Sequence, residues 1–281
     1  MVDFITDILS YGYLRNALFA TILSGIVCGI VGTYVVSRRS LFLAGGVTHS
    51  SFGGLGMALY FGVNPILGAT IFAIASALGI EWAVTKSKIR EDSAVGIIWA
   101  VGMATGALFM SLRPGYTSGD LASYLFGSII TVTTEDVISL AIFAVVLVLG
   151  ALLWLRPIML VAFDRDFARS QGVPTKFISY IMSAITALAI VLSIRTMGII
   201  LLISLLTLPV VIADIFARSY RQIIIAAPII GILGNIFGLY LSYEFEVPPG
   251  AAIIFLLSFT LIVIKVLSLC SENRSATNCR R

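Results

Sequence analysis

The residue of this chain best suited to bind a transition metal is its single histidine, His49. Imidazole is a common ligand for zinc, iron and similar divalent ions, and it binds while neutral, which suits brief binding. Thr48, Ser50 and Ser51 flank His49, and nearby glycines predict that the helix can bend or unwind beside a cavity. His49 is therefore the candidate metal ligand, with the three hydroxyl residues lining its route. The alternative is a hydrogen-bonded packing histidine.

Other chemistry is sparse. Cys28, Cys270 and Cys279 have neither metal-type nor disulfide-type spacing. The chain has no GxxxxGK[ST] loop, so it cannot bind the phosphates of a nucleotide in that way. Any ATP hydrolysis would have to take place on a separate subunit. One histidine and scattered acids do not form a clustered catalytic set, and we predict that the chain is not an enzyme. An ion-coupled secondary transporter, the less favoured alternative, would need carboxylates at mid-membrane, and the sequence offers almost none.

The elements that must position His49 are membrane helices. Hydrophobic residues make up 59% of the 281 residues and charged residues 11%, with a mean hydropathy of +1.07. This composition predicts an all-α, polytopic integral membrane helical bundle. Nine apolar runs are long enough to cross a bilayer: 13–36, 42–60, 65–85, 94–112, 136–155, 175–193, 196–217, 222–243 and 250–270. Glycines and His49 interrupt the second run, and the sixth and seventh almost merge, so eight crossings is the alternative.

Basic residues predict the orientation. With the N-terminus outside, only Arg15, Arg113 and Arg195 of the 18 lysines and arginines fall on the outer side. Positive charge concentrates in cytoplasmic loops, so this threading places the C-terminus and a short tail, 271–281, in the cytoplasm. The charges are spread over separate loops, which argues against nucleic-acid binding.

The cytoplasmic segment 163–172 differs in kind from the other loops. Asp164 is a good helix N-cap and Gly172 a good C-terminal cap, which predicts a helix of two turns. Phe163 and Phe167 lie on one face of that helix, as a protein-docking surface requires. The alternative is an interfacial helix lying against lipid headgroups. The candidate docking residues are Phe163, Asp164, Asp166, Phe167, Arg169 and Gly172.

One acid lies inside a predicted membrane helix. Glu81 is near the inner end of the third apolar run, and Lys86 follows it closely. A charge in that position is costly unless it is paired. We therefore expect an interfacial ion pair between Glu81 and Lys86.

Seven motifs in order carry a resemblance to a known family. They are RRSLFLAGGVTHSSFGGLG at 38–56, NPILGA at 64–69, REDSAVGIIWAVGMATG at 90–106, LASYLFGSI at 121–129, FDRDFARSQGVP at 163–174, MGIILLISLLTLPVVIA at 197–213 and VPPGAAIIF at 247–255. Together they resemble the permease subunit of ABC-type zinc, manganese and iron uptake systems, a type II ABC-importer-like architecture. The match covers nearly the whole chain, so residues 1–281 are expected to form a single transmembrane permease domain.

The resemblance implies a set of partners and a location. It implies inward transport of zinc, manganese or iron, or of a chelated metal, with no stably bound cofactor. It also implies an extracytoplasmic metal-binding protein, two copies of an ABC ATPase, and a homodimer in the lipid of the bacterial cytoplasmic membrane. By the same resemblance, the segment 163–172 corresponds to the coupling helix, which binds in a groove of the ATPase.

One position departs from the family pattern. The family usually has an aspartate four residues before the histidine, and this chain has Gly45 there. A carboxylate and an imidazole at i and i+4 hold a divalent ion better than imidazole alone. Gly45 therefore predicts a weaker or differently built site, and it leaves open which metal is carried.

Overall fold

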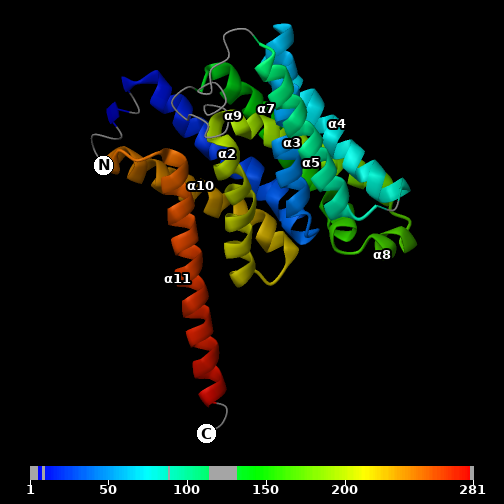
Figure 1. Cartoon of the computed structure of the whole chain (residues 1–281). Helices are drawn as coiled ribbons and strands as arrows, with labels where there is room; N and C mark the ends of the chain where they lie inside the picture. Colours follow the sequence, from blue (N-terminus) through cyan, green and yellow to red (C-terminus); the bar gives the residue numbers. More distant parts are fainter. Residues whose placement is uncertain (1–5, 8–9, 88, 114–131, 279–281) are drawn as a thin grey trace.

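The chain folds as a bundle of helices (Figure 1). The computed structural model describes residues 6–7, 10–87, 89–113 and 132–278, and in these ranges its regular elements are helical. They are α2 (Gly12–Ser37), α3 (Leu41–Phe61), α4 (Pro65–Lys86), α5 (Glu91–Ser111), α7 (Thr134–Phe163), α8 (Arg165–Ser170), α9 (Thr175–Phe216), α10 (Tyr220–Phe245) and α11 (Pro249–Asn278). The predicted all-α membrane bundle is confirmed. The motif at 121–129 lies outside the described residues.

Eight helical stretches in the described ranges are long and apolar enough to cross a membrane. Two of them, Thr175–Ile194 and Thr196–Phe216, are the halves of α9, which the sequence predicts as nearly merged runs. The remaining predicted run, 42–60, is α3, which is 21 residues long but carries His49, Thr48, two serines and several glycines. The described part of the chain thus has eight strongly apolar spans, with α3 as a more polar helix among them.

Helix α2 is the buried centre of the bundle. It packs against α7, α9 and α10, and 67% of its most apolar window is buried. A Cβ atom on Gly29 would lie 2.5 Å from the backbone nitrogen of Pro228 in α10, closer than any real contact. Small residues are what allow membrane helices to approach so closely. Asn235 of α10 adds a polar tie by donating to the Thr21 carbonyl at 2.9 Å.

Helix α3 is held between α4 and α5 by its glycines. A Cβ atom on Gly54 would lie 2.1 Å from the Gly68 carbonyl oxygen of α4, and one on Gly56 would lie 2.5 Å from that of Gly106 in α5. The helix runs from Leu41 to Phe61 without a break. The expectation that these glycines bend or unwind the helix is therefore wrong, because they serve close packing instead.

Contacts between distant segments define two ends of the bundle. Asn16 donates to Thr134 at 3.3 Å, so α2 and α7 begin at the same end. At the other end Arg38, which follows α2, and Arg165 of α8 both contact Glu81 near the end of α4. We call this second end the α8 end. Chain direction therefore alternates from helix to helix, as in a protein that crosses a membrane repeatedly.

Helix α9 reverses direction inside the bundle. Its backbone leaves the helical conformation at Gly198, with φ 75° and ψ 168°. A positive φ is cheap only for glycine. Helix α9 starts at the α8 end, since Thr175 lies only a few residues after α8. Its other end lies there too, since the ring of Tyr220, just after α9, packs on Phe163 at the end of α7. The two halves of α9 therefore run antiparallel.

Helix α11 leaves the bundle towards the C-terminus. Figure 1 shows its second half, drawn in red, extending beyond the other helices. The helix continues to Asn278, so most of the segment 271–281 that the sequence predicts as a tail is helical. Residues 279–281 lie outside the described part of the chain.

Candidate functional site

His49 lies on a face where α3 and α5 meet. Its imidazole stacks on the indole of Trp99 in α5, with ring centroids 4.4 Å apart and planes 2° from parallel. Both side chains are half-buried. Gly45 is one helical turn before His49, and a Cβ atom there would meet nothing within 4 Å. We call Gly45, His49 and Trp99 the His49 face. It is open at the position where the family pattern has a carboxylate.

A single imidazole sets the chemistry of this face. Within the described ranges no group of three or more His, Cys, Asp and Glu side chains could hold a metal ion. A stable zinc site needs about four ligands. One imidazole can bind a passing divalent ion only if water or another chain supplies the remaining ligands. The His49 face therefore suits transient contact with a metal better than storage of one.

The three hydroxyl residues beside His49 are buried. Thr48 and Ser50 are fully buried and Ser51 nearly so. Their hydroxyls donate to carbonyls of their own helix: Thr48 to Ala44, Ser50 to Val47 and Ser51 to Thr48, at 2.7, 3.1 and 2.7 Å. Their hydrogen bonds are thus local to α3, whereas His49 and Gly45 lie on a more open side. A lining role for the three hydroxyls stays a prediction.

The caps of α8 form as the sequence predicts. The Asp164 carboxylate accepts the backbone N–H groups of Asp166 and Phe167, both at 2.9 Å. At the other end Gly172 has φ +77°, and its N–H donates to the Arg169 carbonyl at 3.0 Å. The N–H of Val173 donates to the Ala168 carbonyl, which completes a Schellman motif. A helix of six residues is stabilised by such caps at both ends.

Helix α8 presents an apolar surface to its surroundings. Phe167 of α8 is 52% exposed, while Ala168 between the caps is fully buried. Phe163 is 64% exposed but is the last residue of α7, and the extended backbone of Asp164 separates it from α8, so the expectation that both phenylalanines lie on one face of a single helix is wrong. Asp166 and Arg169 form an exposed ion pair at 3.6 Å. The predicted docking residues therefore lie in and beside one short, capped and accessible helix. Whether a protein binds there stays a prediction at this point.

Glu81 is the centre of a buried ion cluster that sequence reasoning missed. Its carboxylate lies 2.9 Å from the Arg38 guanidinium and 3.0 Å from that of Arg165, and its side chain is 2% exposed. Ser183 of α9 donates to the same carboxylate at 3.4 Å. Among the described side chains, Glu81 does not pair with Lys86, so the predicted pairing is wrong. We call Glu81, Arg38, Arg165 and Ser183 the Glu81 cluster.

The partners of Glu81 come from far along the chain, 43 residues away for Arg38 and 84 for Arg165. Local spacing therefore favoured Lys86, whereas the partners are two distant arginines. The signal that could have found the cluster is the position of the acid itself. A carboxylate inside an apolar run has to face the bundle interior and meet a cation there.

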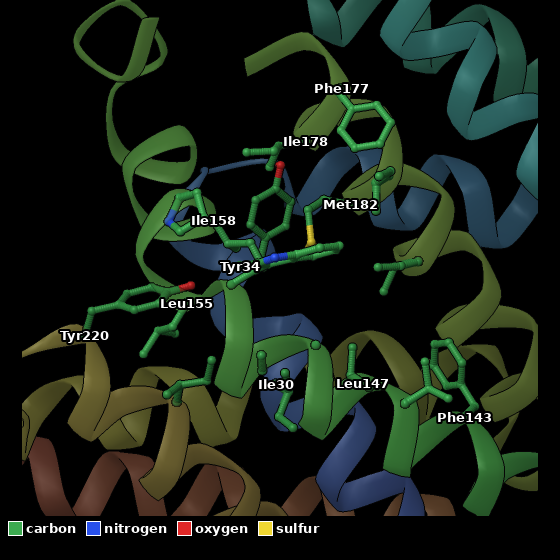
Figure 2. A pocket seen from close by; sticks show the side chains of 18 of the residues that line it. Ile30, Tyr34, Phe143, Leu147, Leu155, Ile158, Phe177, Ile178, Met182 and Tyr220 are labelled. Carbon is green, nitrogen blue, oxygen red and sulfur yellow. The ribbon is translucent and has the colours of Figure 1, made fainter. Parts of the chain in front are cut away.

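A separate cavity of about 380 Å³ lies at the kink of α7. Pro157 cannot donate the helical hydrogen bond, and the backbone of Trp154 is non-helical, so α7 bends there. Figure 2 shows Ile30 and Tyr34 of α2 and Met182 of α9 around this cavity. Its lining includes no His, Cys, Asp or Glu among the described residues, which makes it unsuitable as a metal site.

Comparison with known proteins supports a transport role. A family model described as the ABC 3 transport family matches residues 10–268. An uncharacterised membrane protein of Synechocystis is 33% identical over 263 residues, covering 94% of this chain and 93% of that protein. The manganese transport system membrane protein MntC of Listeria monocytogenes is 30% identical over 251 residues, covering 89% of each chain. PsaBC from Streptococcus pneumoniae, solved in complex with Fab, matches with a TM-score of 0.83 at 25% identity, covering 94% of each chain.

Proposed function

Since this chain belongs to the ABC 3 transport family and is a metal-ion permease of the ABC type, we propose that it forms the route of an ATP-driven importer for manganese, zinc or iron. The observation that carries the proposal is the His49 face. It places the only histidine of the chain on a half-open surface between two membrane helices. Three similar proteins, MntC of Listeria monocytogenes, MntC of Halalkalibacterium halodurans and ScaB of Streptococcus parasanguinis, are named for manganese transport, which makes manganese the first ion to test.

The permease acts as a homodimer in this proposal. One copy supplies one imidazole, and that is too few ligands for a divalent ion. Two copies that face each other across α3 and α5 would bring two His49 side chains to one passage. The open space at Gly45 supports this arrangement, because it leaves room for water or an ion beside each histidine.

A separate ABC ATPase docks at α8, and the α8 end faces the cytoplasm. The exposed Phe167 of α8, the exposed Phe163 just before it and the caps of α8 support docking. Arg38, Arg165 and Arg169 lie at or beside the α8 end, as the positive-inside rule expects of a cytoplasmic surface. An extracytoplasmic metal-binding protein then delivers the ion at the opposite end, where α2 and α7 begin.

Metal uptake by the assembled importer tests the function. The permease, its ATPase and the metal-binding protein are reconstituted in vesicles, and accumulation of manganese, zinc and iron is measured with and without ATP. We expect ATP-dependent accumulation of at least one of these ions. If none accumulates while the ATPase is active and the complex intact, the proposed function is wrong.

His49→Ala then tests the route. We expect uptake to fall about ten-fold or more, because even changes around a metal ligand cost 10–100-fold in affinity. Thr70→Ala is the control: its hydroxyl is also inside a membrane helix but bonds only to Ile66 of the same helix, at 2.7 Å. Equal uptake by both variants would remove His49 from the route.

Gly45→Asp restores the carboxylate of the family pattern. The new acid lies one turn from His49, where a Cβ atom meets nothing within 4 Å. In lipid alone such an acid costs about 3 kcal/mol, whereas beside a metal route it meets water or a cation. We expect normal yield together with longer retention of manganese or a changed ion preference. A misfolded variant, or transport unchanged for every ion, would contradict the assignment.

A further inference from the structure

We propose that Glu81 is the coupling residue of this permease, which ties the docking helix α8 to the two helices that carry the His49 face. The inference rests on the proposed function, because it names the part that links the ATPase to the metal route. It concerns a residue that holds other elements in position and does not itself touch the metal.

The Glu81 carboxylate holds α8 by more than one contact. The Arg165 guanidinium donates to both of its oxygens, at 3.0 and 3.4 Å. Arg38 donates to one oxygen at 2.9 Å, and Ser183 approaches the same atom at 3.4 Å. Removing one partner from a buried ion pair leaves an uncompensated charge, which is strongly unfavourable. A displacement of α8 therefore has to carry Glu81 and Arg38 with it.

Arg38 connects the cluster to α3. Only three residues, 38–40, separate α2 from α3, and Arg39 among them has a left-handed φ of 58°. The N–H groups of Arg39 and Ser40 donate to carbonyls of Val36 and Val35, both at 3.0 Å, so this turn is tight. His49 follows about two turns into α3, roughly 12 Å along the helix. A shift of Arg38 is thus passed to the base of the helix that carries His49.

The same guanidinium reaches α5. It lies 3.8 Å from the carboxylate of Glu91, the first residue of α5, and Trp99 follows about two turns later. Burial works against the charge on Arg38, but Tyr34, Glu81 and Glu91 outweigh it and raise the pKa of the guanidinium above its ordinary value. Arg38 therefore stays charged and bound to both acids. Glycine contacts pack α3 and α5 together, so both helices respond to the cluster.

Stability alone does not explain the cluster. Well-packed apolar residues often replace a buried ion pair without loss of stability. The cluster lies where the docking helix meets the bundle: it joins α8 to α4, α9 and the turn that leads into α3, and its Arg38 lies 3.8 Å from the first residue of α5. A charged link is directional, and it holds helices in one register where an apolar contact would let them slide. That property is what coupling of ATP hydrolysis to transport requires.

Arg165→Gln is the decisive variant, because Glu81 keeps its 2.9 Å ion pair with Arg38 and the replaced side chain is 32% exposed, so no buried charge is left without a partner. The reconstituted complex is assayed for ATP hydrolysis and metal uptake in the same vesicles. We expect the metal moved per ATP to fall at least five-fold while ATPase binding persists. Arg165→Lys, which keeps the charge, should recover part of the ratio. Arg90→Gln is the matched control, since Arg90 is 85% exposed and pairs only with the exposed Asp92.

Hydrogen exchange separates this inference from the proposed function. In the wild type, ATP binding by the ATPase should change exchange at residues 41–49 and 91–99, and in Arg165→Gln that response should vanish while α8 still responds. This readout needs no cargo, so it decides the inference even if no metal is transported. An unchanged response at 41–49 and 91–99, an unchanged ratio of metal to ATP, or loss of ATPase binding in Arg165→Gln would each overturn the inference.

Discussion

His49 and Glu81 are both single ionisable residues inside apolar helices, yet their surroundings are opposite. The Glu81 carboxylate is almost fully buried and receives donors from two arginines and a serine. His49 is half-buried, rests on the face of an indole ring, and has open space one turn away at Gly45. A group whose hydrogen bonds are already made inside the protein holds structure together. A group with room beside it is available to a passing ion.

The comparison predicts that Glu81 matters most for folding. Glu81→Ala removes the shared partner of two guanidiniums and leaves Arg38, which is 7% exposed, without its shortest ion pair. The expected loss is about 3 kcal/mol. The melting temperature of the purified protein in detergent should fall by roughly 10 °C.

Glu244→Ala is the control for this change, because Glu244 is an exposed acid of α10. Its melting temperature should stay within a degree or two of the wild type. If Glu81→Ala were as stable as Glu244→Ala, the Glu81 cluster would not differ from a surface charge, and the contrast with His49 would disappear.

Two glycines of α3 give a sharper comparison within one helix. A Cβ atom on Gly54 would lie 2.1 Å from the Gly68 carbonyl oxygen, whereas one on Gly45 would meet nothing within 4 Å. Gly54→Ala should cost about 1–3 kcal/mol by overpacking. Gly45→Ala should be neutral or gain up to about 1 kcal/mol, because alanine favours a helix. Thermal unfolding of both variants checks this, and equal losses would mean that the His49 face is also packed.

The fold could be predicted from sequence because its cause is local. A run of about twenty apolar residues has to be helical in a bilayer, and the caps of α8 follow from Asp164 and Gly172 at a fixed spacing. The reversal at Gly198 lies two residues inside the second of two runs that the sequence already shows almost merging. Each of these features depends on residues within a few positions of one another.

The site was harder to predict because its partners are distant. Glu81 pairs across 43 and 84 residues, and sequence spacing pointed to Lys86 instead. The glycines around His49 looked like sites of bending, but the backbones of α4 and α5 lie against several of them. The neighbours of His49 belong to another helix, and Trp99 could not be paired with it from spacing alone. Tertiary packing, which a single sequence does not display, decided these cases.

A smaller effect is expected at the cap of α8. Asp164→Ala removes the acceptor of two backbone N–H groups, which costs about 1 kcal/mol locally. If the ATPase binds the folded α8, its affinity should fall about five-fold. Asp164→Asn keeps an acceptor and should bind nearly as well. Hydrogen exchange at residues 165–170 should rise in the alanine variant only, and unchanged exchange would show that α8 is held by its packing and not by its cap.

A small effect on stability is expected at Trp99. Replacing it by leucine removes the stack on His49 but keeps an apolar side chain in the same half-open position. An aromatic pair contributes about 0.5–1.5 kcal/mol beyond its buried area, and half-burial places Trp99 at the lower end. The melting temperature should therefore change little, while the imidazole loses the surface that orients it. We expect the metal concentration for half-maximal uptake to rise about two- to three-fold, since losing roughly 0.6 kcal/mol of orientation corresponds to that factor.

Trp82→Leu is the control for this last change, because Trp82 is 53% exposed on α4 and, among the described residues, the indole that stacks on His49 is that of Trp99. Uptake by Trp82→Leu should match the wild type. A loss of stability in Trp99→Leu as large as that in Glu81→Ala would place the His49 face in the packed interior. The difference between the two regions would then be one of composition and not of function, and the route for the metal would have to be sought on another face of the bundle.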